Sequence, residues 1–522
     1  MGPLDEGALA DALIEGRWPE ALELAERVMA TAPASARLWF VRGVLLRRAM
    51  RMDEAMAAYT RSIELGYEGV GPYLELFQHL DKRGQIDDAL ACWRLAFERG
   101  YSTARFHSLA LDTWLKRPGA TAEELLEAHR EWAVRYARPD AAVSPLKVER
   151  FDGSRPLRVG YVCSFWEAPT IRYLVWPVLT RHDRARVIPY LYVSGPLQMG
   201  ETWRELYEPH AAAVREVFAL DDREYLELVR SDQIDVLVDL NGHSGLQRYA
   251  AMASRCAPVQ VVYLNYTSTT AVPNIDYIIG DRWSPPVHTE PLFTEQIERL
   301  PGCFLCYEYR DDVRIAPVAP GPAARAGHVT FGCFSSGMKI TPPLIAWWCE
   351  ILKRVPDATM FIRNFEMSPA DNRRALERQF VDHGIDRVRL RLVGKGTRHD
   401  VVRSYADVDI ALDTYPYCGG NTTAEALWQG VPVVTLQGPR FSSSYGASLL
   451  HAAGCPELIT HTPDDYKGLA VDLAQAPDRL AGYRGRLRSM VIEHGLGNAD
   501  TFTPQFEGAL IGMRMRAGHG RS

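Results

Sequence analysis

Residues 412–436 read LDTYPYCGGNTTAEALWQGVPVVTL, and this stretch decides the fold of the chain. A short apolar strand leads into a glycine pair, Gly419 and Gly420, which allows close turns of the backbone. Thr422 and Thr423 then open a helix. Because threonine and asparagine are common helix caps, an ordinary capped helix is one interpretation. The other is a diphosphate site, since N–H groups, two hydroxyls and the positive end of a helix dipole all favour an anion.

Strand and helix patterns alternate on both sides of this stretch. Short β-branched runs at residues 329–334, 359–362, 388–393, 410–413 and 433–436 are separated by helical patterns. A similar series comes earlier, at residues 157–163, 187–193, 234–240, 259–264 and 277–280. Such apolar runs are typical of strands buried in parallel sheets. We therefore expect an α/β body of two Rossmann-like, doubly wound domains facing a cleft, with the ligand at the carboxyl ends of the strands.

Neither strand series begins with a known nucleotide-binding motif. The first βα turn, residues 158–164, holds one glycine where a dinucleotide fold has G-x-G-x-x-G. The phosphate-binding sequence G-x-x-x-x-G-K-[ST] occurs nowhere in the chain. These observations argue against a dinucleotide-dependent oxidoreductase and against a P-loop NTPase.

The N-terminal part of the chain repeats itself. Ala21, Ala55 and Ala89 occupy the same place in three similar segments, and each is 34 residues from the next. This is the tetratricopeptide period, which predicts an α-helical solenoid with a degenerate fourth repeat at 121–137. The solenoid's concave groove favours binding of a protein partner or substrate, and the repeats offer a surface for homo-oligomers. A plain helical spacer is the alternative.

These patterns divide the 522 residues into several parts. We expect a solenoid over 1–140, a linker over 141–155 and a first Rossmann-like domain over 156–314. A second linker over 315–327, a second Rossmann-like domain over 328–490 and a C-terminal helix and tail over 491–522 complete the chain.

The composition of the chain indicates which classes of partner it can bind and in which cell compartment it is found. A net charge of −6 lacks the basic footprint of a nucleic-acid-binding protein. No run of 18 apolar residues and no signal-peptide pattern occurs, so we expect neither a membrane span nor export. Nine scattered cysteines, an odd number, suit reduced and mostly buried thiols. The sequence thus predicts a cytoplasmic protein.

The full string at 412–436, with further motifs, resembles the protein O-linked N-acetylglucosamine transferase/SPINDLY family. Those motifs occur in the family's order as DLNGH at 239–243, APVQ at 257–260, DYII at 276–279, RLPG at 299–302, and VTFG at 329–332 followed by Lys339. The resemblance covers about residues 155–459, and the repeats are the family's usual companion. It implies a GT-B glycosyltransferase that inverts the anomeric centre and transfers a sugar from a nucleotide donor to protein hydroxyls.

The resemblance also implies donor-side roles for individual residues. Lys339 matches the lysine that meets the donor diphosphate, where an ammonium stabilises the negative charge of the leaving nucleotide. Thr422 and Thr423 match the phosphate-binding pair, and Gly419 and Gly420 shape their loop. Glu425 matches an acidic position suited to a ribose hydroxyl.

On the acceptor and sugar side of the cleft, in the first Rossmann-like domain, the resemblance implies roles for Asn241, His243 and Gln260. His243 is a candidate general base, with a histidine that only bonds a backbone group as the alternative.

Several positions depart from the family pattern. Ala168 stands where a proposed catalytic histidine belongs, and the adjacent Glu167 is the substitute candidate, against an ordinary loop glutamate. The family's base-stacking histidine aligns with Val401, two residues after His399.

Asn421 stands where animal enzymes have histidine, and Ser335 and Ser336 replace the usual Asn or Gln sugar contacts. The changes therefore cluster on the nucleoside and sugar rather than on the diphosphate.

The leading hypothesis is transfer of a sugar, by family default N-acetylglucosamine from UDP-N-acetylglucosamine, to Ser or Thr hydroxyls of a protein held by the repeats. Another nucleotide sugar (hexose, fucose or an acidic flagellin sugar) and modification of Asn are alternatives. A catalytically weak, repeat-based adaptor is the alternative from another class. We expect no cofactor and no metal, because helix termini and a lysine neutralise the phosphates, and we interpret Asp407 and Asp409 as structural.

Overall fold

The computed structural model describes residues 3–196, 202–308 and 318–517. It divides into two compact units, one formed by residues 1–117 and 333–397 and the other by residues 118–332 and 398–522. The start of the predicted linker, residues 315–317, and the end of the predicted tail, residues 518–522, lie outside the described residues.

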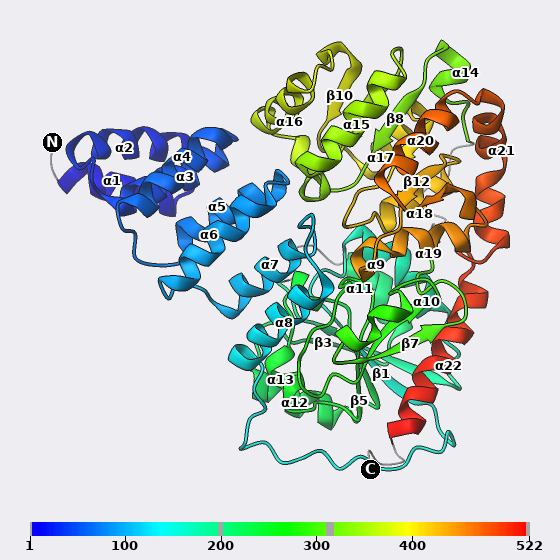
Figure 1. The fold of residues 1–522 in the computed structure, drawn as a ribbon. Coiled ribbons are helices and arrows are strands. Elements are labelled where there is room, and N and C mark those ends of the chain that lie inside the picture. Colours follow the sequence, from blue (N-terminus) through cyan, green and yellow to red (C-terminus); the bar gives the residue numbers. More distant parts are fainter. Residues whose placement is uncertain (1–2, 197–201, 309–317, 518–522) are drawn as a thin grey trace. The chain divides into compact units, whose positions relative to one another are not determined.

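The first unit begins with the helical repeats (Figure 1). Its helices are α1 (Pro3–Ile14), α2 (Trp18–Thr31), α3 (Ala36–Arg48), α4 (Met52–Glu64), α5 (Gly71–Lys82), α6 (Ile86–Glu98) and α7 (Ala104–Trp114). The repeat alanines Ala21, Ala55 and Ala89 are buried between paired helices, as the period predicts. Their lack of bulk lets the two helices of each repeat approach closely.

An α/β segment completes the first unit. It contains the 3-10 turn η4 (Gly337–Lys339), α15 (Pro342–Arg354), β9 (Thr359–Arg363), η5 (Phe365–Met367), α16 (Ala370–Asp382), η6 (Arg387–Arg389) and β10 (Leu390–Val393). Strands β9 and β10 pair in parallel, with Met360 opposite Leu390.

The second unit opens with helix α8 (Ala122–Tyr136), followed by a seven-stranded parallel sheet in the order β3-β2-β1-β4-β5-β6-β7. The strands are β1 (Leu157–Cys163), β2 (Val187–Val193), β3 (Ala213–Glu216), β4 (Val236–Asp239), β5 (Val259–Val262), β6 (Tyr277–Asp281) and β7 (Gln296–Leu300). Helices α9 (Pro169–Leu174), α10 (Trp176–Arg181), α11 (Thr202–Tyr207), α12 (Asp222–Ser231) and α13 (Tyr249–Ala253) connect them, with η1 (Glu208–His210), η2 (Gly242–Ser244) and η3 (Val287–Leu292). The strand order reverses between β1 and β4, where doubly wound folds bind ligands.

The second sheet has the order β10-β9-β8-β11-β12-β13. Its pairs β10/β9, β8/β11, β11/β12 and β12/β13 are parallel. Its remaining strands are β8 (Thr330–Cys333), β11 (Ile410–Leu412), β12 (Val433–Leu436) and β13 (Ile459–Thr460). The other elements are α14 (Pro322–Ala326), α17 (Arg398–Ser404), η7 (Tyr405–Asp407), α18 (Asn421–Trp428), η8 (Phe441–Ser443), α19 (Tyr445–Ala452), η9 (Pro456–Leu458), α20 (Pro463–Ala474), α21 (Pro477–Glu493) and α22 (Ala499–Ala517). The predicted fold class, helical repeats followed by two Rossmann-like sheets, is confirmed.

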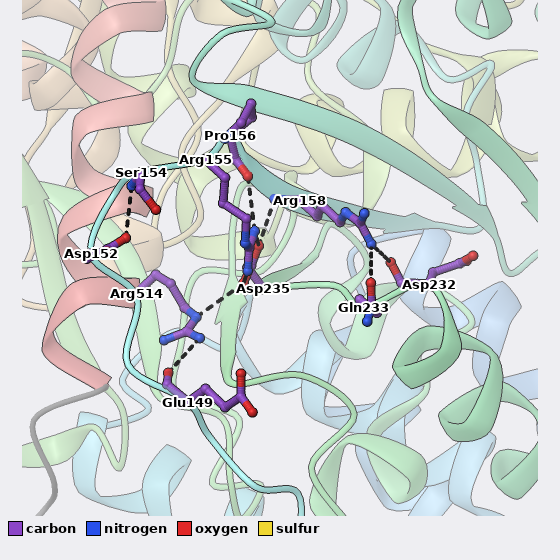
Figure 2. Close-up of polar contacts among 10 residues, drawn as sticks. All are labelled: Glu149, Asp152, Ser154, Arg155, Pro156, Arg158, Asp232, Gln233, Asp235 and Arg514. Atoms are coloured by element: carbon purple, nitrogen blue, oxygen red, sulfur yellow. Dashed lines mark hydrogen bonds and ion pairs between the residues drawn. The ribbon is translucent and has the colours of Figure 1, made fainter.

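The C-terminal helix α22 packs back onto the first sheet. Phe506 contacts Tyr263 with ring centroids 5.0 Å apart, and the buried Glu507 accepts from His182 Nδ1 at 3.0 Å. Near the end of the helix, Arg514 Nε lies 3.4 Å from Asp235 Oδ1 and Nη2 donates to the carbonyl of Glu149 at 2.9 Å (Figure 2).

Asp235, which precedes β4, is the centre of this contact (Figure 2). Its carboxylate is nearly inaccessible and accepts from both Nη atoms of Arg155, at 2.6 and 2.9 Å, and from the N–H of Arg158 at 3.0 Å. A buried carboxylate is stable only when it is paired and hydrogen-bonded in this way. One side chain thus joins the segment before β1, the start of β4 and α22.

None of the helices in the described residues combines the length and apolar character needed to cross a bilayer. All nine cysteines are free, and eight of them are buried.

Candidate functional site

Asp413, directly after β11, organises the loop that was predicted to bind the diphosphate. Its Oδ1 accepts from the N–H groups of Gly419 at 2.7 Å and Thr414 at 2.9 Å, and Oδ2 accepts from Thr435 Oγ1 at 2.7 Å. The carboxylate is 4% exposed. Three short hydrogen bonds therefore fold residues 413–419 back toward the strand end and deliver the chain to the start of α18.

The start of α18 has the features of an anion site. Gly420 is the N-cap residue, and no side chain caps the helix. Gly419 approaches the threonines closely, because a Cβ there would lie 2.6 Å from Thr422 Oγ1 and 2.7 Å from Thr423 Oγ1. Asn421 Oδ1 is buried and has no hydrogen-bond partner. The structure thus places the predicted phosphate-binding pair, Thr422 and Thr423, in one loop with Gly419, Gly420 and Asn421, and the helix dipole adds positive potential at this end.

Glu425, one turn further along α18, is occupied by protein partners. Its side chain is almost fully buried and forms an ion pair with Arg398. Oε2 accepts from Tyr405 Oη at 3.1 Å, and Oε1 lies 3.4 Å from Tyr307 Oη. These contacts support a role in holding α18 in place, and a contact to a ribose hydroxyl stays a prediction.

Lys339 belongs to the first unit, where it ends the turn η4 after β8. Its N–H donates to the carbonyl of Ser336 at 3.0 Å, and the residue is half-buried. Ser336 Oγ donates to Glu366 Oε1 at 2.8 Å, and the carbonyl of the buried Ser335 accepts from Asn364 Nδ2 at 3.0 Å. Ser335 and Ser336 are therefore parts of the scaffold around Lys339, whereas their sugar contacts stay predictions.

The loop after β4 carries the residues predicted for the acceptor side. Burial raises the pKa of Asp239 to about 6, although Asp239 accepts from the N–H groups of Asn241 at 3.1 Å and Gly242 at 2.9 Å. Asn241 is itself fully buried. Its Oδ1 accepts from the N–H of Ser164 at 2.7 Å, and its Nδ2 donates to Asp239 Oδ1 at 3.0 Å. The amide thus ties the loop after β4 to the loop after β1.

His243 lies inside a cluster of aromatic rings. It is fully buried and packs edge-on against Trp132 and His129 of α8, with centroid distances of 4.6 and 5.3 Å. Tyr249 and Tyr266 complete the cluster, each with its ring centroid 5.1 Å away. These ring contacts give His243 a packing role, and its role as general base stays a prediction.

Gln260 is likewise committed to the protein interior. Its Oε1 accepts from the N–H of Cys256 at 2.9 Å, and Nε2 donates to the carbonyls of Met252 and Asn274 at 2.8 and 2.7 Å. These bonds support a structural role, and its place on the acceptor side stays a prediction.

The model of glycosyl transferase family 41 matches residues 145–314 and 325–506. The chain belongs to this family. The resemblance to the O-linked N-acetylglucosamine transferase/SPINDLY family is thereby confirmed.

Among curated family 41 relatives, probable UDP-N-acetylglucosamine–peptide N-acetylglucosaminyltransferases SPINDLY of Hordeum vulgare and Arabidopsis thaliana are each 32% identical over 394 residues. The matches cover 75% of this chain and 41% and 43% of those relatives, so the chain spans about two-fifths of their length. A mutant O-GlcNAc transferase from Thermobaculum terrenum has a similar structure, with a TM-score of 0.87, 29% identity and 99% coverage of both chains.

Two further candidates are Glu167 and His399. Glu167 lies in the loop between β1 and α9, is half-buried, and burial raises its pKa. The adjacent Ala168 is the N-cap residue of α9 and has no proton-accepting group. His399 is exposed on helix α17.

Sequence analysis missed the residues that support this family 41 site. Asp413 and Arg398 hold the diphosphate loop and α18, Glu366 holds the turn before Lys339, and His129 and Trp132 enclose His243. Asp413 ends the predicted strand at 410–413, and this position was the available signal. The other four depend on contacts between distant segments, for which the sequence has no local mark.

Proposed function

We propose that this chain is a glycosyltransferase that moves a sugar from a nucleotide diphosphate donor to a hydroxyl of a protein side chain. The observation that carries the proposal is the start of α18, where an uncapped helix, the close approach of Gly419 and the two threonines form an anion seat. The SPINDLY relatives of Hordeum vulgare and Arabidopsis thaliana are named as probable peptide N-acetylglucosaminyltransferases, which supports a protein acceptor.

In this mechanism the residues act on the leaving group. The α18 N-terminus and the Thr422 and Thr423 hydroxyls bind the diphosphate, while the Lys339 ammonium stabilises the charge that develops as the glycosidic bond breaks. An in-line attack by the acceptor hydroxyl inverts the anomeric centre, and the proposal needs no metal. The repeats hold the acceptor protein, and a reducing, cytoplasmic setting suits the free thiols.

A donor panel tests this function. UDP-N-acetylglucosamine is the first donor, and UDP-glucose, a GDP-fucose and a CMP-linked acidic sugar represent the alternatives, including those used to modify Asn. A donor at 100 times its Kd stabilises the folded chain by about 2.7 kcal/mol, which raises the Tm. Mass spectrometry of an acceptor protein then reports the transferred mass and residue. Absence of both stabilisation and transfer with every donor would refute the proposal.

The Lys339→Ala variant tests the role of the lysine. Removing one preorganised group that stabilises transition-state charge lowers kcat about 10²- to 10³-fold. Donor binding persists through α18, so the donor-induced Tm shift is retained in part. An unchanged kcat would exclude Lys339 from the reaction.

Glu167 is our candidate for the general base, because His243 is enclosed and Ala168 has no basic group. A carboxyl with a raised pKa accepts a proton more readily than an ordinary one. We expect Glu167→Gln to lower kcat about a hundredfold or more and to remove the acid limb of the pH–kcat profile.

The second candidate function is a catalytically weak adaptor protein. Two observations favour it: His243 is enclosed by aromatic rings, and Ala168 stands where the family has a histidine. A chain that binds protein partners but neither binds nor turns over any donor would support it.

A further inference from the structure

The loop that carries Lys339 is packed against the repeats within the first unit. A Cβ on Gly337 would lie 2.8 Å from the carbonyl oxygen of Lys82, at the end of α5. A Cβ on Gly84, in the turn between α5 and α6, would lie 2.1 Å from the carbonyl oxygen of Ile340 and 3.4 Å from that of Gly337. Lys339 therefore sits between two residues whose backbones touch the third repeat.

The other repeats show that this contact, rather than the turn itself, requires a glycine at 84. Gly16, Met50 and Gly84 occupy the same place in successive repeats, with φ values of 72°, 61° and 70°. Met50 shows that a side chain is accommodated in this turn, where it points into solvent and is 49% exposed. At Gly16 a Cβ would meet the Trp18 ring at 3.6 Å, an ordinary contact. At Gly84 it would overlap a backbone carbonyl, which has no side-chain freedom to move away.

Two polar contacts hold the same loop from other directions. The buried Lys116 Nζ, paired with Asp81 and Asp112 at 3.0 Å, also donates to Met338 Sδ at 3.3 Å. A buried ammonium with two carboxylate partners is fixed in place and so fixes the neighbour it touches.

Arg83 makes the second contact. Its Nε donates to Asn372 Oδ1 at 2.8 Å, and Asn372 Nδ2 donates to the carbonyl of Glu366 at 2.8 Å. The Glu366 carboxylate then accepts from Ser336 Oγ at 2.8 Å and from the N–H of Gly337 at 3.2 Å.

We propose that the third repeat (α5 and α6) is a structural part of the transferase site. Gly84 and Arg83 of this repeat, together with Lys116 after α7, are positioning residues that fix where the Lys339 loop lies. This inference rests on the proposed function, in which Lys339 stabilises the leaving nucleotide. Moving the Ile340 carbonyl out of the way of a side chain at 84 moves Lys339, its direct neighbour. A displacement of about 1 Å at a reacting group lowers the rate about a hundredfold.

The test compares Gly84→Ala with Gly16→Ala in the full chain. Both substitutions place a methyl group at a φ near +70°, so they share the backbone strain and differ in what the methyl meets. We expect Gly84→Ala to lower kcat about tenfold to a hundredfold, with a smaller change in the donor KM, and Gly16→Ala to stay within about twofold of the wild type. Equal effects of the two substitutions would overturn the proposal.

The effect of Gly84→Ala on kcat in the presence and absence of Lys339 separates a positioning role from a general loss of stability. If Gly84 acts through the lysine, Gly84→Ala lowers kcat by less than about twofold in a Lys339→Ala background, since effects of residues that act as a unit are not additive. A full tenfold loss in that background would overturn the proposal.

Arg83→Ala, which removes hydrogen bonds without adding bulk, provides a second variant should Gly84→Ala unfold. Its control is Arg61→Ala, which removes a surface pair with Glu64.

A structural readout keeps this inference distinct from the proposed function. Crystal structures of the wild-type and Gly84→Ala chains report the position of residues 337–340 without any turnover. If the wild type transfers no sugar but the loop moves, the proposed function fails and the positioning contact stands. If the wild type is active and the loop superposes in both chains, the positioning role is wrong.

Discussion

A buried aspartate precedes the loop after β4 and another begins the loop after β11: Asp239 is the last residue of β4, and Asp413 directly follows β11. Asp239 accepts from the N–H groups of Asn241 and Gly242, and Asp413 accepts from those of Thr414 and Gly419. Beyond this shared start, the two loops use their polar groups differently.

The loop after β11 presents an uncapped helix start with half-buried Asn421 and Thr422. The loop after β4 places Asn241 and His243 fully inside the protein. A loop that turns its polar groups inward stabilises the fold, whereas a loop that leaves its helix N-terminus uncapped can bind an anion. Substitutions around β4 should therefore change stability, and substitutions around β11 should change ligand binding.

The largest expected effect concerns protonation of His129, beside His243. Burial lowers its pKa to about 4, against 6.5 in an unfolded chain. The unfolded state thus binds a proton between these pH values while the folded state does not, so stability is lost as the pH falls from 6.5 to 4. We expect the wild type to lose about 3 kcal/mol more over this range than His129→Gln, which has no such proton.

Urea unfolding of both chains at several pH values measures this difference. Asp239 titrates in the opposite sense but is common to both chains, so its contribution cancels. Parallel pH dependences of the two chains would show that His129 is not buried as a neutral ring.

The next effect tests the loop after β11. In Gly419→Ala the new methyl group would lie within 2.7 Å of both threonine hydroxyls and push them away from the helix start. We expect donor affinity to fall about a hundredfold. Gly468→Ala in α20 is the control, because its methyl group would meet no atom within 4 Å. Isothermal titration with the donor measures both, and equal affinities would mean that the threonines do not bind the diphosphate.

The smallest effect concerns His243. His243→Ala leaves a cavity among Trp132, Tyr249 and Tyr266 and should lower the free energy of unfolding by about 2 kcal/mol. If the ring only packs, kcat of the folded variant stays near the wild-type value. A hundredfold fall in kcat at full folding would instead restore His243 as the general base and erase the contrast between the loops.

Sequence reasoning recovered the strands that lie inside the sheets. The predicted runs at 157–163 and 187–193 coincide with β1 and β2. It missed β3, β7 and β13, which are three of the four edge strands, and recovered the fourth, β10, from the run at 388–393. Edge strands face solvent on one side and therefore lack the continuous apolar run that marks a central strand.

The site residues were also predictable where their role depends on local sequence and not where it depends on contacts with distant segments. The glycines and threonines of 419–423 act through local backbone geometry, which the sequence states directly. The burial of His243 depends on Trp132, a residue more than 100 positions earlier in the chain. No local pattern separates an enclosed histidine from one that faces a substrate.

Repeat arrays are often treated as sets of interchangeable modules, because each repeat contacts only its neighbours. The turn at Gly84 limits that freedom in this chain. A copy of the second repeat grafted into the third position would bring methionine, the residue at 50, against the carbonyl of Ile340. Lengthening or shuffling the array is therefore compatible with this architecture only when the module next to the lysine loop keeps its own glycine.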